Sequence, residues 1–181
     1  MIPISSNTRY TGTARVLHWL IAALMATQFI VAWTMPHLGR DTPVTTLISL
    51  HFSLGVLILA AAVVRLAWRM SHAEPTPEAD LPPWQVKSAR AVHWLLYLLL
   101  FVVPVLGWIN ASWRGMPVTA FGLFKLPELL SKGSQGWGWS GDVHGILANY
   151  VMLALIGLHV LAALYHRFVR HDGVVRRITW G

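Results

Sequence analysis

Four stretches of 23 or 24 residues contain no Asp, Glu, Lys or Arg, and they limit what this chain can fold into. They comprise residues 16–39, 42–64, 91–113 and 143–166. A helix of roughly 20 apolar residues crosses the hydrocarbon core of a bilayer, and only helices and closed barrels satisfy their backbone hydrogen bonds in lipid. We therefore predict an all-α integral membrane protein built as a four-helix bundle. The predicted spans cover about residues 16–36, 44–68, 89–112 and 142–168.

The composition supports this interpretation, because 55% of the residues are hydrophobic and only 12% are charged, about half the charged fraction of a soluble domain. The first apolar stretch is longer than the hydrophobic region of a signal peptide and has no convincing cleavage site after it, so we expect it to be retained. Residues 1–181 then form a single transmembrane domain with a long outer segment at 113–141. Within that Gly- and Trp-rich segment we expect a short amphipathic surface helix at about residues 121–131.

The cationic side chains are divided unequally between the two sides of the predicted bundle. With the N-terminus inside, ten lie in inner segments and four in outer loops. This positive-inside pattern predicts that both termini are cytoplasmic. The inner cations are Arg9, Arg15, Arg65, Arg69, Lys87, Arg90, Arg167, Arg170, Arg176 and Arg177, and the outer cations are Arg40, Arg114, Lys125 and Lys132. We expect the basic C-terminal segment to contact anionic membrane lipids, and not nucleic acid, because no nucleic-acid-binding motif accompanies it.

Histidines inside the spans are the candidate functional residues, since a buried imidazole in a membrane is costly without a role. The chain has no cysteine, which excludes disulfides, iron–sulfur clusters and thiolate ligands. Because neighbouring spans run antiparallel, the histidines separate into two layers. The outer layer contains His51 and His144, and the inner layer contains His18, His93, His159 and His166. In the fourth span His144 and His159 are fifteen residues apart, which is roughly 22 Å along a helix and roughly 60° around it.

Two layers of histidine favour two haem groups of the b type over a single metal cluster. Two imidazoles from facing helices, on either side of a flat macrocycle, are the ligands of a low-spin b haem. The chain has no CxxCH motif for covalent attachment. Zinc or copper prefers ligands that converge at one depth, often with Cys or a carboxylate, and no acid lies inside the four apolar stretches. Only one outer pair is available, His51 with His144, whereas four inner histidines leave the inner pair open.

The inner histidines are given different expected roles. We favour His18 and His159 as ligands and a packing role for His93. His166 lies one heptad after His159, at the membrane interface, where it could face a haem edge or a quinone. His37, His72 and His171 are expected to face headgroups or to be hydrogen-bonded.

The spans and their histidines resemble the bacterial cytochrome b561 family over nearly the whole chain. The matching motifs are RVLHWL, SLHFSLGVLILAAAVVRLAWR, AVHWLLYLLLFVVPVLGW, AFGL and VHGILANYVMLALIGLHVLAALYH. The resemblance implies a multi-pass protein of the bacterial inner membrane with two b haems. The inner haem would lie on His18 and His159, and the outer haem on His51 and His144. It also implies oxidation of superoxide at the periplasmic side and transfer of the electrons to ubiquinone.

Several charged residues can be assigned expected roles in that reaction. Arg114, Lys125 and Lys132, with Arg40, would attract the superoxide anion, although Asp41, Glu128 and Asp142 leave these outer loops only one net positive charge. Arg15 and Arg65 would contact the propionates of the inner haem or anchor their helices at the headgroups. His166, near Tyr165, Trp19 or His93, would serve the quinone.

Two other functions fit the same residues. A cytochrome b subunit that anchors a hydrogenase or another periplasmic dehydrogenase would take electrons from a docked redox protein through the outer segment. A haem-binding bundle whose histidines never take part in electron transfer is the non-enzymatic alternative.

Overall fold

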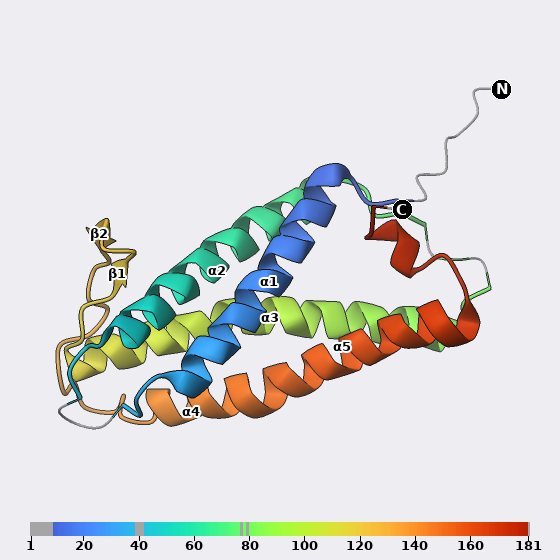
Figure 1. Cartoon of the computed structure of the whole chain (residues 1–181). Coiled ribbons are helices and arrows are strands. Elements are labelled where there is room, and N and C mark those ends of the chain that lie inside the picture. Colours follow the sequence, from blue (N-terminus) through green and yellow to red (C-terminus); the bar gives the residue numbers. More distant parts are fainter. Residues whose placement is uncertain (1–8, 39–41, 77, 79, 181) are drawn as a thin grey trace.

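The computed structural model describes residues 9–38, 42–76, 78 and 80–180. Four helices in this part of the chain are long and apolar enough to cross a membrane, and they run up and down as a bundle (Figure 1). The first three are α1 (Gly12–Thr34), α2 (Thr46–Ser71) and α3 (Pro83–Arg114). The fourth span, Ser140–Arg170, comprises α4 (Ser140–Ile146), the π-helical η1 (Leu147–Met152), α5 (Leu153–Tyr165) and the π-helical η2 (His166–Arg170). The predicted four-helix membrane bundle is confirmed.

The helix ends follow local capping chemistry. The hydroxyls of Thr11 and Thr45 accept hydrogen bonds from backbone N–H groups three residues later, at 3.3 and 3.4 Å, as N-cap residues do. Helix α3 starts with Pro83, whose missing N–H costs nothing in the first turn. It therefore begins earlier than the predicted boundary at residue 89. It ends at Gly115, whose φ of 72° is left-handed and lets the backbone turn away from the helix.

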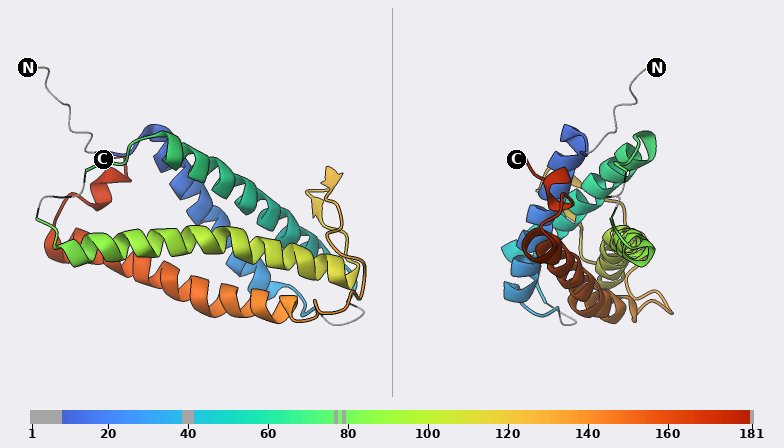
Figure 2. Two further views of the ribbon diagram at one scale, coloured as in Figure 1. Left: turned by 180° about the vertical axis from the view of Figure 1, so that it is seen from behind. Right: turned by 90° about the vertical axis from the view of Figure 1, so that its right-hand side faces the viewer.

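The apolar centre of the bundle lies between the two layers of histidine. Ile58, Ala62 and Met152 are nearly inaccessible there, with Leu99 and Val103 of α3 packed against them. Large apolar side chains on the outside of the bundle remain exposed, as expected for surfaces that face acyl chains instead of water. The two views in Figure 2 show the four long helices from behind and from one end.

The terminal segments of the chain meet at one end of the bundle, which we call the inner end. The C-terminal segment, with its short 3-10 helix η3 (Val175–Arg177), folds back from η2 toward the start of α1 (Figure 1). The Tyr10 N–H donates to the carbonyl of Arg177 at 3.2 Å. The indole N–H of Trp19 donates to the carbonyl of Ile178 at 3.0 Å. These bonds close the inner end of the bundle with the last residues of the chain.

The outer segment contains a β-hairpin where the sequence predicted a surface helix. Strands β1 (Thr119–Ala120) and β2 (Phe124–Lys125) pair antiparallel, so the expected amphipathic helix at residues 121–131 is wrong. Phe121 and Gly122 have φ values of 50° and 72°. Two successive left-handed residues form a tight hairpin turn and cannot continue a right-handed helix. The hairpin lies at the end opposite the terminal segments, which we call the outer end (Figure 1).

One buried hydroxyl fastens this hairpin to the bundle. Ser53 of α2 is 3% exposed, and its hydroxyl accepts the N–H of Phe121 at 2.9 Å. The same oxygen lies 3.0 Å from the carbonyl oxygen of Thr119. Because both backbone groups belong to the hairpin, Ser53 fixes its position relative to α2.

Replacing Ser53 with alanine should loosen the hairpin without unfolding the bundle. The substitution leaves the Phe121 N–H without its acceptor, at a cost of about 1–3 kcal/mol for a buried group. We expect faster amide exchange at Phe121 in detergent-solubilised protein, measured by hydrogen–deuterium exchange. Ser71→Ala is the control, because the exposed Ser71 hydroxyl bonds carbonyls of its own helix. Equal exchange in both variants would show that Ser53 does not hold the hairpin.

Candidate functional site

The outer histidines face one another across two helices. His51 lies in an early turn of α2 and His144 lies in α4, and their ring centroids are 6.1 Å apart. Nδ1 of His144 is 2.8 Å from the carbonyl oxygen of Val103. A carbonyl can only accept, so Nδ1 carries the proton and Nε2 keeps the lone pair that a metal needs.

The backbone of α3 approaches the His144 ring closely at Gly107. A Cβ atom added at Gly107 would lie 3.0 Å from Cε1 and 3.1 Å from Nδ1 of His144. Such contacts are too short for a methyl group beside a ring held in place. Gly107 therefore gives the imidazole room to reach the Val103 carbonyl.

Polar atoms around His51 remain unsatisfied by protein. Nδ1 of His51 and Oε1 of Gln28 are buried without a hydrogen-bond partner among the described residues. The Gln28 amide nitrogen donates to the carbonyl of His51 at 3.1 Å and lies 3.5 Å from Nε2 of its ring. Buried polar atoms without partners are costly, so this pattern fits a site that binds another group.

Three histidines lie close together in the inner layer. His18 of α1 and His93 of α3 both contact His159 of α5, with ring centroids 6.1 and 5.2 Å away. The structure thus brings together the two favoured ligands and His93. Among the described residues, no three His, Asp or Glu side chains form a group that could hold a metal ion by themselves.

The ring separations test whether these pairs fit a group that is held from two sides. A metal–imidazole bond is about 2.0–2.1 Å and the ring centre lies about 1.1 Å behind the nitrogen, so two imidazoles that hold one metal from opposite sides have centroids about 6.2–6.4 Å apart. The pairs His51–His144 and His18–His159, both at 6.1 Å, come close to this separation. The His93–His159 pair, at 5.2 Å, is too close.

Arg15 and Arg65, the two arginines expected to contact the inner haem, bind backbone carbonyls of other segments. Arg65 of α2 donates to the carbonyl of Ala14 at 2.9 Å and lies beside the Tyr97 ring. Arg15 of α1 donates to the carbonyl of Thr179 at 3.1 Å, while its buried Nε has no hydrogen-bond partner within the described part of the chain. Both arginines therefore connect segments at the inner end, whatever else they bind.

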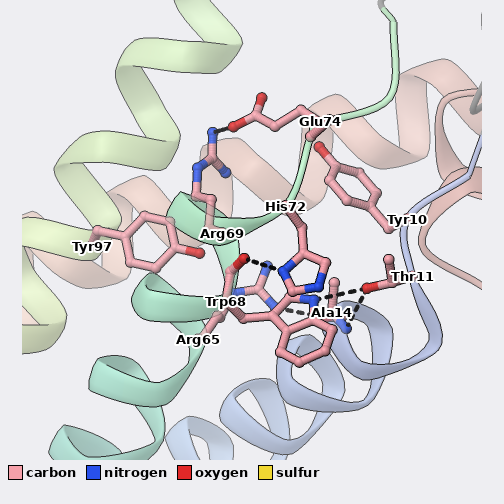
Figure 3. A pocket seen from close by; sticks show the side chains of 10 residues that line it. Tyr10, Thr11, Ala14, Arg65, Trp68, Arg69, His72, Glu74 and Tyr97 are labelled. Carbon is pink, nitrogen blue, oxygen red and sulfur yellow. Dashed lines mark hydrogen bonds and ion pairs between the residues drawn. The ribbon is translucent and has the colours of Figure 1, made fainter.

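A small pocket beside Arg65 is formed where α1, α2 and α3 meet (Figure 3). Trp68 stacks on His72 at 3.9 Å and donates its indole N–H to the Thr11 hydroxyl at 2.9 Å. The ring of His72 also lies within hydrogen-bond distance of Ser71, as expected for a histidine outside the spans. Arg69 forms an ion pair with Glu74 at its rim. These contacts join the side chains that line the pocket to one another.

His166 is held by a carboxylate that the sequence analysis missed. Its Nδ1 lies 2.6 Å from Oδ2 of Asp172, and the ring of Tyr165 is 5.8 Å away. Of the other two expected neighbours, Trp19 donates to the carbonyl of Ile178 and His93 contacts His159. The signal in the sequence was an acid six residues after an interfacial histidine, but its return to that histidine depends on how the helix ends.

The outer cations do not gather at one point. Lys125, on the hairpin, forms an ion pair with Glu128 at 2.8 Å, which offsets its charge. The stem of Lys132 packs against Gly115, next to Arg114, whose Nε donates to Asn110 at 3.3 Å. Lys132 and Arg114 therefore share the end of α3, whereas Arg40 and Asp41 lie outside the described residues.

A four-helix membrane bundle with paired imidazoles in two layers defines a membrane cytochrome b. The sequence profile described as prokaryotic cytochrome b561 matches residues 9–181, and the chain belongs to this family. It is an electron-transfer protein of the bacterial inner membrane that binds haem b.

Curated relatives cover nearly the same length. Cytochrome b561 homolog 2 of Escherichia coli is 30% identical over 94% of this chain and 90% of the relative. The probable superoxide oxidase CybB of Yersinia pestis is 30% identical over 95% and 96%. Cytochrome b562 of Cereibacter sphaeroides is 28% identical over 93% and 94%.

Substituting Gly107 with alanine should displace the His144 ring and lower the haem content of the purified protein. The added methyl group meets the ring at 3.0 Å, and overpacking of this kind costs about 1–3 kcal/mol. Haem per chain, measured by the pyridine haemochrome assay, gives the readout. Gly12→Ala is the matched control, because a Cβ there meets nothing within 4 Å. The same haem content in both variants would contradict a role for the His144 position.

Proposed function

We propose that this protein is a di-haem b cytochrome that oxidises superoxide at the outer end and reduces ubiquinone at the inner end. One observation carries the proposal. A single span holds His144 and His159, and each is paired at 6.1 Å with an imidazole from another helix. The similarity to a probable superoxide oxidase supports the choice of donor.

The proposed ligands are His51 with His144 at the outer site and His18 with His159 at the inner site. Haem, when bound, supplies one-electron carriers at two depths of the membrane. The chain's own part is to orient the ligands, as the Val103 carbonyl does for His144, and to exclude water between the layers. We assign His93 a packing role against His159 because their 5.2 Å separation is too short for opposite ligands.

The two ends of the bundle are assigned from their charges. The excess of Arg and Lys near the inner end supports cytoplasmic termini and contact with anionic lipids. At the periplasmic end we propose that Lys132 and Arg114 attract superoxide. Lys125 contributes less, because Glu128 neutralises it.

The overall reaction balances with two superoxide anions for each quinone. Each superoxide gives up one electron and leaves as O₂, and ubiquinone takes the two electrons and two protons to become ubiquinol.

We place the quinone near His166, whose Nε2 is the ring nitrogen not occupied by Asp172. Arg15 and Arg65 are proposed to hold the carboxylates of the inner haem while keeping their carbonyl bonds.

Stopped-flow absorbance tests the proposed function directly. We expect superoxide to reduce the haems of the oxidised, purified protein, so that the absorbance bands of reduced haem b appear after mixing. Ubiquinone should then reoxidise the haems and remove these bands. Lys132→Gln should slow the reduction, with the difference shrinking as salt screens the charge. The control is Lys87→Gln, at the inner end. Haem bands that stay oxidised on mixing with superoxide would rule out the superoxide activity.

Replacing single inner histidines tests the ligand assignment. His159→Ala should lose the inner haem, because it removes one of the two residues that would hold it. His93→Ala should keep both haems, as measured by haem content and by the number of steps in a redox titration. The assignment is wrong if His93→Ala loses a haem and His159→Ala does not.

The hairpin supports a second candidate function, that of a membrane-anchor cytochrome subunit. Phe121, Leu123 and Phe124 are 52%, 83% and 58% exposed, so the outer end presents apolar side chains that a periplasmic redox protein could cover. Failure to react with superoxide, together with co-purification of a periplasmic dehydrogenase, would favour this function.

A further inference from the structure

The geometry at the end of the fourth span fixes His166 through its backbone. The N–H groups of His171 and Asp172 both point to the carbonyl of His166, the second at 3.3 Å. His171 adopts a left-handed φ of 53°, which ends the helix and turns the chain back. As a result, the carboxylate of Asp172 returns to the side chain of His166.

The Asp172 carboxylate then holds the imidazole itself. Oδ2 lies 2.6 Å from Nδ1 of His166 and also accepts from Nε of Arg170 at 3.1 Å, while Oδ1 accepts the Val174 N–H at 3.1 Å. The side chains of His166 and Asp172 are only 15% and 16% exposed. A carboxylate with this many donors is fixed in place, so it orients His166 as the aspartate of a catalytic triad orients its histidine.

Partial burial raises the pKa of Asp172, but the hydrogen bonds from His166, Val174 and Arg170 and the charge of His166 outweigh it and hold that pKa below its usual value. The carboxylate is therefore ionised at neutral pH and can only accept hydrogen bonds. Nδ1 of His166 must then carry a proton.

Other charged groups near this pair are already matched. Arg170 also donates to the carbonyl of Asp80 at 3.4 Å, and Glu78 forms an ion pair with Arg177 at 3.0 Å. The ring of Tyr165 lies 5.8 Å from that of His166. The carboxylate that contacts the imidazole is that of Asp172.

We propose that Asp172 is a positioning residue for proton delivery to the quinone. It keeps Nδ1 of His166 protonated and stabilises the imidazolium, so that the Nε2–H group gives its proton to the reduced quinone. Nε2 is then reprotonated by water at the inner surface. This inference rests on the proposed quinone reduction, in which two electrons and two protons convert ubiquinone to ubiquinol. A purely structural role would be to pin the C-terminal segment.

Asp172→Asn separates the two roles. The variant should be reduced by superoxide as fast as the parent, because the outer end is unchanged. Reoxidation by ubiquinone should be slowed about ten-fold or more, since a positioned acid contributes about 10²–10⁴-fold to proton transfer. Asp172→Glu should recover part of the rate.

Glu78→Gln is the matched control, because it removes an ion pair of the same C-terminal segment without contacting His166. A spectroscopic readout independent of activity is the ¹⁵N resonance of His166 in nanodiscs, which should show a protonated Nδ1 in the parent and a change of tautomer in Asp172→Asn. Equal effects of Asp172→Asn and Glu78→Gln on reoxidation, or an unchanged tautomer, would overturn the proposal. If the parent itself fails to reoxidise with ubiquinone, the proposed function and the proton-delivery role fail together, and the parent measurement identifies that case.

Discussion

The cost of placing imidazoles inside an apolar bundle is the constraint on which the rest of this structure depends. Lipid offers these rings no hydrogen bonds, so each ring must find a partner within the protein or on a bound group. His144 bonds the Val103 carbonyl, whereas Nδ1 of His51 has no partner among the described residues. The helices around these rings bring them together in pairs, His51 with His144 and His18 with His159, each with ring centroids 6.1 Å apart.

Much of this arrangement could be predicted from the sequence, because it depends on periodicity and depth alone. Charge-free stretches determine which segments enter the membrane, and antiparallel packing then determines the depth of each histidine. The pairing of His51 with His144 follows from those two facts. The placement of Arg114, Lys125 and Lys132 could not be predicted, because it depends on loop geometry and on partners such as Glu128.

Where the predictions failed, local backbone conformation was the reason. The helix expected at residues 121–131 is a hairpin because two successive residues adopt positive φ. Asp172 reaches His166 only because a left-handed residue ends the helix between them. Neither conformation has a signature in hydrophobic periodicity. The proximity of His93 to His159 likewise depends on how closely α3 and α5 approach.

The π-helical turn η1 in the fourth span also changes how its histidines are spaced. It lies at Leu147–Met152, between His144 and His159, and a turn closed by i→i+5 bonds takes up about one more residue than an α-helical turn. His144 and His159 are fifteen residues apart in the sequence. Because η1 takes up one of these residues, their relative direction around the helix is that of residues about fourteen apart in a regular α-helix. A chain one residue shorter here, with an uninterrupted helix, would present both rings in the same directions. The length of this span can thus vary by one residue during evolution without moving either layer.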